Sequence, residues 1–177
     1  MQDAEIRQIP LSALIIGLAV ILPQFFHLIG LGATFLPMYL PIMVGSMFLT
    51  WKFVILTAVI SPLISWLITG MPPIVPPVLP VLMIELTVIG LFISFLRQYS
   101  ARPVWLITIL AVLLDRLVLL LIVEGITPLL GITSGIFTAA VVVAGIPGSV
   151  LQIFVVPFTV KLIEKKYPQW KISRENR

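Results

Sequence analysis

Three charged residues lie inside apolar stretches of the sequence, where charge is rare. Glu85 lies in a run that ends at Arg97, and Asp115 and Arg116 are neighbours in the following run. A charged side chain at membrane depth is costly and usually pairs with another charge or serves a substrate path. Two hypotheses follow: a charge network that holds helices together, or a site that contacts a polar ligand.

The spacing of these charges predicts their partners. Adjacent side chains on a helix point about 100° apart and do not face each other. We therefore expect Asp115 and Arg116 each to pair with a group on another helix. At about 1.5 Å of rise per residue, both residues and Glu85 lie roughly 17 to 20 Å from the positively charged ends of their helices. That depth is near the middle of a membrane, and Gln152 in the last apolar run is slightly lower.

A second set of polar and aromatic residues lies near the opposite ends of the apolar runs. A ring of such amphipathic side chains suits the capture of a small molecule with polar and apolar parts. A single His or Trp at that depth is also typical of an anchor at the membrane interface. The candidate ligand-binding residues from both sets are Gln24, His27, Phe35, Tyr39, Trp66, Thr69, Glu85, Asp115, Arg116, Glu124 and Gln152.

The elements that must position these residues are transmembrane helices. Of the 177 residues, 60% are hydrophobic and 10% are charged, whereas an ordinary soluble domain has about 25% charged residues. Apolar runs of about 18 to 25 residues, long enough to cross a membrane as a helix, recur along the chain. No small-residue cleavage site follows the first run, so we expect it to remain as a helix rather than to be removed as a signal sequence.

We predict one integral membrane domain, residues 1–177, with an all-α fold of six transmembrane helices. Pro10 is placed to start the first helix, and Pro147 is expected to bend the last one. Five of the ten residues from Met71 to Pro80 are proline, which excludes a regular helix from this segment. The predicted helices cover approximately residues 11–31, 36–50, 53–69, 78–96, 104–123 and 133–164.

Positive charge predicts the orientation of these helices. Ten of the eleven Lys and Arg residues lie in the N-terminal lead, the turns after the second and fourth helices, and the C-terminal tail. Loops rich in Lys and Arg stay in the cytoplasm, so we expect both termini to be cytoplasmic. The net charge of +4 has the same explanation and gives no reason to expect nucleic-acid binding.

Several kinds of chemistry find no support in the sequence. There are no cysteines, which excludes disulfides and thiolate metal sites, and His27 is the single histidine. No Walker loop and no nucleophile–base pair is visible. We therefore expect no enzymatic activity, no metal and no cofactor. An intramembrane enzyme that uses His27 with Asp115 or Glu85 is an alternative, although His27 lies close to the end of the first helix.

Four blocks of sequence resemble the substrate-binding S component of energy-coupling factor vitamin transporters. They are FLPMYLPIMVGS (35–46), SPLISWLITGMPP (61–73), IELTVIGL (84–91) and AGIPGSVLQIFVVPFTVKLIEK (144–165). Family members usually carry histidine at the position of Tyr39. The resemblance spans most of the chain and implies a six-helix bundle in a prokaryotic cell membrane. It also implies vitamin binding near the outer face, under the loops after the first, third and fifth helices.

The resemblance implies partners as well. An S component hydrolyses nothing itself, works with a transmembrane scaffold subunit and two cytoplasmic ATPase subunits, and is thought to topple in the membrane to release its vitamin. Ala13 and Gly17 are similar to the small-residue face that meets the scaffold, and their spacing of four suits close helix contact. An autonomous secondary transporter or channel is the alternative function, although the two halves of the chain show no convincing repeat.

The identity of the vitamin stays open. Arg116 would suit a carboxylate, as in pantothenate, folate or a biotin-like molecule. The acids Glu85, Asp115 and Glu124 would suit a cationic or donor-rich ligand such as a pyridoxine or a pyrimidine. Taken together, these four charges lean slightly away from a strongly anionic substrate.

Overall fold

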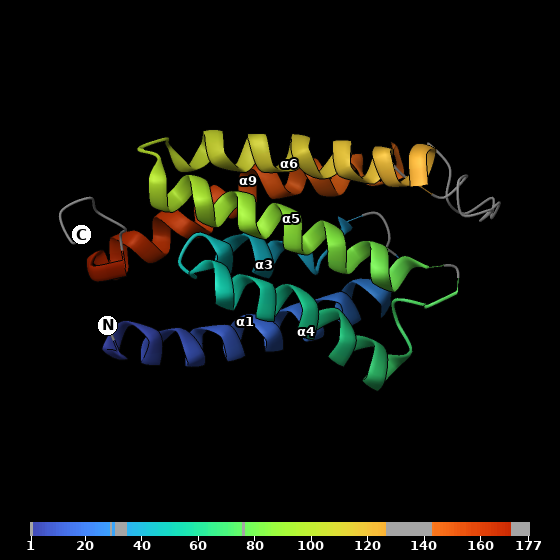
Figure 1. Cartoon of the computed structure of the whole chain (residues 1–177), viewed down its shortest axis with the longest axis horizontal. Helices are drawn as coiled ribbons and strands as arrows, with labels where there is room; N and C mark the ends of the chain where they lie inside the picture. Colours follow the sequence, from blue (N-terminus) through green and yellow to red (C-terminus); the bar gives the residue numbers. More distant parts are fainter. Residues whose placement is uncertain (1, 29, 31–34, 76, 127–142, 171–177) are drawn as a thin grey trace.

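The computed structural model describes residues 2–28, 30, 35–75, 77–126 and 143–170. Every regular element in these ranges is a helix (Figure 1), which confirms the predicted all-α fold. Five of the helices are long and apolar enough to cross a membrane. The elements are α1 (Gln2–Leu28), α3 (Tyr39–Ser46), α4 (Trp51–Thr69), α5 (Val78–Tyr99), α6 (Val104–Leu121), the π-helix η1 (Ile122–Ile126), α9 (Ile146–Lys166) and the 3-10 helix η2 (Pro168–Trp170).

The short helix α3 lies at the centre of the bundle, in contact with α1, α4, α5 and α9. Seven of its eight residues are buried, and at about 1.5 Å per residue it is too short to cross a membrane core of about 30 Å. The predicted helix over 36–50 is therefore wrong at both ends. Leu36 adopts a left-handed conformation before α3, and the chain turns at Met47 after it.

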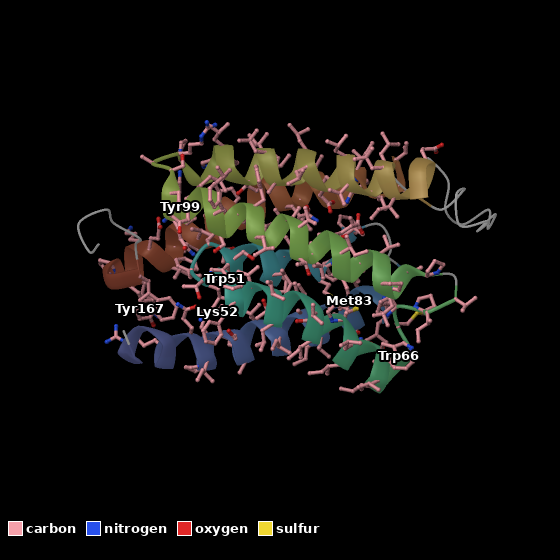
Figure 2. The ribbon with its side chains drawn as sticks, in the orientation of Figure 1. Trp51, Lys52, Trp66, Met83, Tyr99 and Tyr167 are labelled. Carbon is pink, nitrogen blue, oxygen red and sulfur yellow. The ribbon has the colours of Figure 1, made fainter. Side chains whose placement is uncertain are left out.

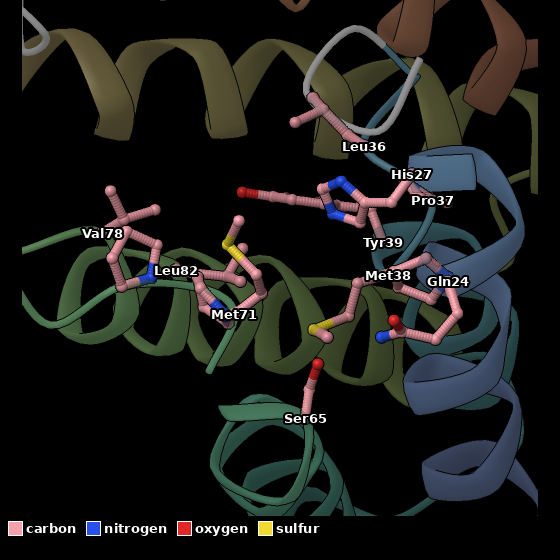
Figure 3. A pocket seen from close by; sticks show the side chains of 13 residues that line it. Gln24, His27, Leu36, Pro37, Met38, Tyr39, Ser65, Met71, Val78 and Leu82 are labelled. Atoms are coloured by element: carbon pink, nitrogen blue, oxygen red, sulfur yellow. The ribbon is translucent and has the colours of Figure 1, made fainter. Parts of the chain in front are cut away.

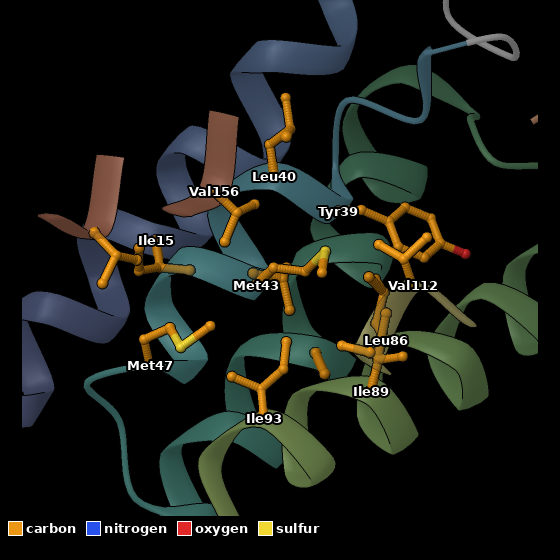
Figure 4. Packing of buried hydrophobic residues seen from close by; sticks show 14 of the residues in the cluster. Ile15, Tyr39, Leu40, Met43, Met47, Leu86, Ile89, Ile93, Val112 and Val156 are labelled. Atoms are coloured by element: carbon orange, nitrogen blue, oxygen red, sulfur yellow. The ribbon is translucent and has the colours of Figure 1, made fainter. Parts of the chain in front are cut away.

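The apolar core forms around α3 (Figure 4). Ile42 and Met43 are at most 1% exposed and pack in one cluster with Leu86 and Ile89 of α5. Gly90 lets α5 approach closely, since a β-carbon there would lie 2.7 Å from Cγ1 of Val54 on α4. The centre of the molecule is therefore a closely packed unit that joins three helices.

Two prolines take positions that differ from the prediction. Pro10 lies within α1, which already begins at Gln2. Nearby, Oε1 of Gln8 accepts hydrogen bonds from the backbone N–H and the hydroxyl of Thr50, at 2.9 and 3.0 Å, and so ties this end of α1 to the start of α4. Pro147 lies in the first turn of α9, where its missing N–H breaks no helical bond. Val143 and Ala144 are also helical and Gly145 forms a turn, so the helical path is interrupted just before Pro147 and not bent within a continuous α9.

The other helix ends differ from the predicted ranges by a few residues. α1 ends at Leu28 instead of residue 31, α5 continues to Tyr99 instead of residue 96, and α6 passes into a π-helix at Ile122. α9 begins at Ile146, and the part of the last predicted helix over 133–142 lies outside the described residues.

The start of α1 and the end of α9 lie at the same end of the bundle, which we call the basic end (Figure 1). Lys52 and Trp51 lie toward it, together with Tyr99 and Tyr167, whereas Trp66 lies toward the opposite end (Figure 2). An ion pair between Arg97 of α5 and Glu164 of α9 joins two helices at the basic end. The described Lys and Arg residues at this end are Arg7, Lys52, Arg97, Arg102, Lys161, Lys165 and Lys166.

Candidate functional site

A cavity of about 370 Å³, shown from close by in Figure 3, is lined by the ends of α1 and α4 and the start of α5, which lie opposite the basic end in Figure 1. It is walled by the last turns of α1, the segment before α3, the proline segment after α4 and the first turns of α5. Small-molecule sites typically have volumes of about 300 to 1,000 Å³. The lining residues are Pro23, Gln24, His27, Leu36, Pro37, Met38, Tyr39, Ser65, Met71, Pro72, Pro73, Val78 and Leu82.

The proline segment is shaped by the way α4 ends. Gly70 caps α4 in the left-handed region, with φ of +71°. The hydroxyl of Thr69 accepts a hydrogen bond from the backbone N–H of Met71 at 3.2 Å. Prolines follow, which fix the backbone and donate no hydrogen bonds. The N–H of Leu79 then donates to the carbonyl of Pro73 at 3.0 Å, which ties the segment to the start of α5.

The opposite wall contains a strained residue. Leu36 has φ of +48°, a left-handed conformation that is rare for a bulky side chain. The backbone N–H of Tyr39 donates to its carbonyl at 3.1 Å. Gly145 lies against its side chain, since a β-carbon at Gly145 would be 3.2 Å from Cδ1 of Leu36. Such strain persists only where the surrounding structure holds it, and it is concentrated at functional sites.

Four of the lining side chains carry polar groups. Gln24 and His27 come from the last turns of α1, Tyr39 starts α3, and Ser65 lies on α4. Figure 3 shows the Ser65 hydroxyl directed toward Met38, and the Tyr39 ring beside His27 with its hydroxyl pointing away from the imidazole. The other lining side chains are apolar. The cavity therefore suits a mainly apolar ligand that makes a few directed hydrogen bonds.

Tyr39 connects the cavity to a buried group of charges, which we call the acidic cluster: Glu85, Asp115 and Arg116. The Tyr39 hydroxyl donates to Oε2 of Glu85 at 2.9 Å. Glu85 and Asp115 are only 4% and 1% exposed. Glu85 also lies close enough to Asp115 and Arg116 to interact electrostatically with both. Among the described residues, Oε1 of Glu85 and Oδ1 of Asp115 have no hydrogen-bond partner. These two carboxyl oxygens could therefore each accept a further hydrogen bond.

Arg116 pairs with its neighbour Asp115, and the prediction that each would pair across helices is wrong. Nε of Arg116 donates to Oδ2 of Asp115 at 3.1 Å, and Nη2 completes an ion pair with the same oxygen. The long guanidinium side chain reaches back along α6, and it packs directly against Gly145, which has no side chain to obstruct it. An unpaired buried charge is strongly destabilising, so Arg116 and Asp115 pair with each other although they are neighbours on one helix.

The predicted site residues fall into two groups. Gln24, His27 and Tyr39 line the cavity, and Glu85 lies behind Tyr39. Phe35 packs on Phe26, with ring centroids 5.8 Å apart. The predicted residues that do not line the cavity are Phe35, Trp66, Thr69, Glu85, Asp115, Arg116, Glu124 and Gln152.

Three of these residues, Thr69, Glu124 and Gln152, lie in separate environments outside the cavity. Glu124 is exposed in the π-helix, and the Thr69 hydroxyl is used in the turn after α4. Gln152 is completely buried in α9, and neither amide atom has a hydrogen-bond partner among the described residues. These contacts give the three residues no common site.

The sequence reasoning missed most of the apolar walls and one polar residue, Ser65. Met38, Met71 and Leu82 resemble any other core or lipid-facing residue in a chain of this composition, so composition alone carries no signal for them. The spacing of residues along two helices could have indicated part of the site. Ser65 lies one turn before Thr69, and Leu82 lies one turn before Glu85, on the same helix faces.

Within the described residues, no three His, Asp or Glu side chains lie close enough together to hold a metal ion. The polar side chains of the cavity can hydrogen-bond an organic ligand. The chain has no match among protein-family models, curated proteins or solved structures.

Proposed function

We propose that this protein is the substrate-binding membrane subunit of an energy-coupling factor importer. It captures a small water-soluble vitamin or related micronutrient at the outer face of a prokaryotic cell membrane. The observation that carries the proposal is the cavity of about 370 Å³, which lies between α1, α3 and the segment that joins α4 to α5. Two of the three loops implied by the sequence resemblance contribute to its walls.

The distribution of charge supports the proposed orientation. The basic end carries the start of α1, the end of α9 and, of the described residues, every Lys and Arg except Arg116. Because positively charged ends stay in the cytoplasm, the cavity faces the outside in this arrangement. In the proposed subunit, the five long helices make five crossings and residues 35–50, of which α3 is only the middle part, make the sixth.

The first helix offers a surface for the proposed scaffold subunit. Ala13 is exposed and Gly17 is half-buried, and a β-carbon at Gly17 would meet no atom within 4 Å. Leu14, Leu18 and Ile21 are exposed beside them. In the proposed complex this face of α1 packs against the scaffold, two ATPase subunits supply the energy, and this chain hydrolyses nothing itself.

Binding to the purified protein tests the proposal. Native mass spectrometry and titration with a panel of water-soluble vitamins should find one that binds at micromolar concentration or below. Ser65→Leu places a larger side chain in the cavity and should weaken that binding by about tenfold or more, equivalent to about 1.4 kcal/mol. Thr87→Leu, on α5 outside the cavity, is the matched control and should bind normally.

Two results would count against the proposed function. Failure of the entire panel to bind would remove its basis. Substrate accumulation by liposomes that contain this chain alone, with no scaffold or ATPase, would favour the autonomous transporter instead.

A further inference from the structure

The cavity has no permanently charged group of its own to balance an anion. Among the described residues, no Asp, Glu, Lys or Arg lines it. Arg116, the basic residue within α6, is bonded to Asp115 and packed against Gly145. His27 is the one lining side chain among the described residues that can carry a positive charge, and an anionic ligand that does not pair with it would lose its hydration in an apolar cavity, which is unfavourable.

The carboxyl group of Glu85 lies directly behind one wall. Val78 and Leu82 line the cavity from α5, and Glu85 follows on the same face of that helix, about one turn deeper. The Tyr39 hydroxyl donates a hydrogen bond to Oε2 of Glu85, whereas Oε1 has no hydrogen-bond partner among the described residues. Oε1 is itself buried behind the cavity wall, so a ligand N–H reaches this free acceptor only when the Tyr39 ring moves aside.

The apolar walls suit a flat ring. Met38 and Met71 direct flexible thioether side chains toward the cavity (Figure 3), and sulfur makes favourable contacts with aromatic rings. Pro37, Pro72 and Pro73 add rigid apolar surfaces. A planar heterocycle would bury both faces against these side chains.

We propose that the substrate is a neutral or positively charged nitrogen heterocycle, and that Glu85, positioned by Tyr39, selects it over anionic analogues by accepting a ligand N–H. This inference rests on the proposed function, because it names the class of molecule that the same cavity binds. It assigns Glu85 a specificity role and leaves Arg116 a structural one.

Matched pairs of ligands test the charge preference in the unmodified protein. Nicotinamide and nicotinate share one ring and differ in charge, as do pyridoxine and 4-pyridoxate. Each pair is titrated against the full-length protein in detergent at one pH and salt concentration. The neutral member of at least one pair should bind more tightly than its anionic partner by about tenfold or more, the size expected from one buried hydrogen bond that is made or left unmade.

Variants then identify the residue responsible. Glu85→Gln should reduce the discrimination between the two members of a pair by about tenfold. Glu124→Gln removes an exposed acid at the same end of the bundle and should leave the discrimination unchanged. The comparison within the unmodified protein decides the charge preference even where Glu85→Gln does not fold.

The outcomes separate this inference from the proposed function. If the anionic member of a pair binds as tightly as the neutral one, or if only a vitamin outside the heterocycle class binds, the inference is overturned and the proposed function stands. If Glu85→Gln folds and keeps full discrimination, Glu85 is not the specificity residue. If no vitamin binds at all, both proposals fail.

Discussion

The close packing of Gly90 predicts how stability responds to a single methyl group. Gly90 lies in α5 where it meets α3 and α4, and Gly90→Ala is the smallest possible perturbation of that contact. The new β-carbon would lie 2.7 Å from Cγ1 of Val54 and 3.0 Å from Oγ of Ser46. Valine is branched at the β-carbon and has little rotamer freedom in a helix. The helices themselves must therefore separate.

Two opposing effects set the size of the change. Overpacking a well-packed core costs about 1 to 3 kcal/mol, whereas replacing glycine by alanine within a helix gains about 0.5 to 1 kcal/mol. We expect Gly90→Ala to lower the free energy of unfolding by about 1 to 2 kcal/mol, which corresponds to a lower Tm. Gly90→Leu, which adds more atoms at the same point, should lower it further.

Gly17→Ala is the matched control, because it has the same chemistry in another apolar helix with open space around the new β-carbon. Thermal unfolding of both variants in one detergent measures the difference. Gly17→Ala should keep or slightly raise the Tm. A Gly90→Ala protein as stable as the wild type, or an equal loss in both variants, would refute the packing argument.

Two further predictions concern polar contacts. Arg116→Met should destabilise the protein by about 3 to 5 kcal/mol, because it leaves Asp115 buried without its ion pair. Adding Asp115→Asn to this variant should restore most of the lost stability. Additive losses of stability in the double variant would contradict this prediction. Gln8→Ala should cost about 1 kcal/mol by removing the acceptor for the N–H and hydroxyl of Thr50, whereas Gln8→Glu, which keeps an acceptor, should lose less. Thermal unfolding measures both series, and equal losses in the two Gln8 variants would contradict the second prediction.

Some features of this protein follow from the sequence by itself. Long apolar runs predict helices because only a helix satisfies its own backbone hydrogen bonds in a membrane, and five such helices are present. The start of α5 at Val78 follows from the prolines before it. Gln24, His27 and Tyr39 were identified from their types and their places near the ends of apolar runs, and all three line the cavity.

Other features depend on contacts between distant parts of the chain. The length of α3 is set by the helices around it and by the left-handed Leu36, whereas its apolar sequence is compatible with a longer helix. The partner of Arg116 depends on the space that Gly145 leaves beside α6.

The membership of the cavity was also decided only by the tertiary structure. Ser65 and Met71 lie on either side of the turn that follows α4, and Leu82 lies on the next helix. In a chain where most residues are hydrophobic, hydropathy distinguishes membrane from water but does not distinguish a lipid-facing side chain from a cavity wall. That distinction depends on how the helices rotate and pack against one another, which no local pattern encodes.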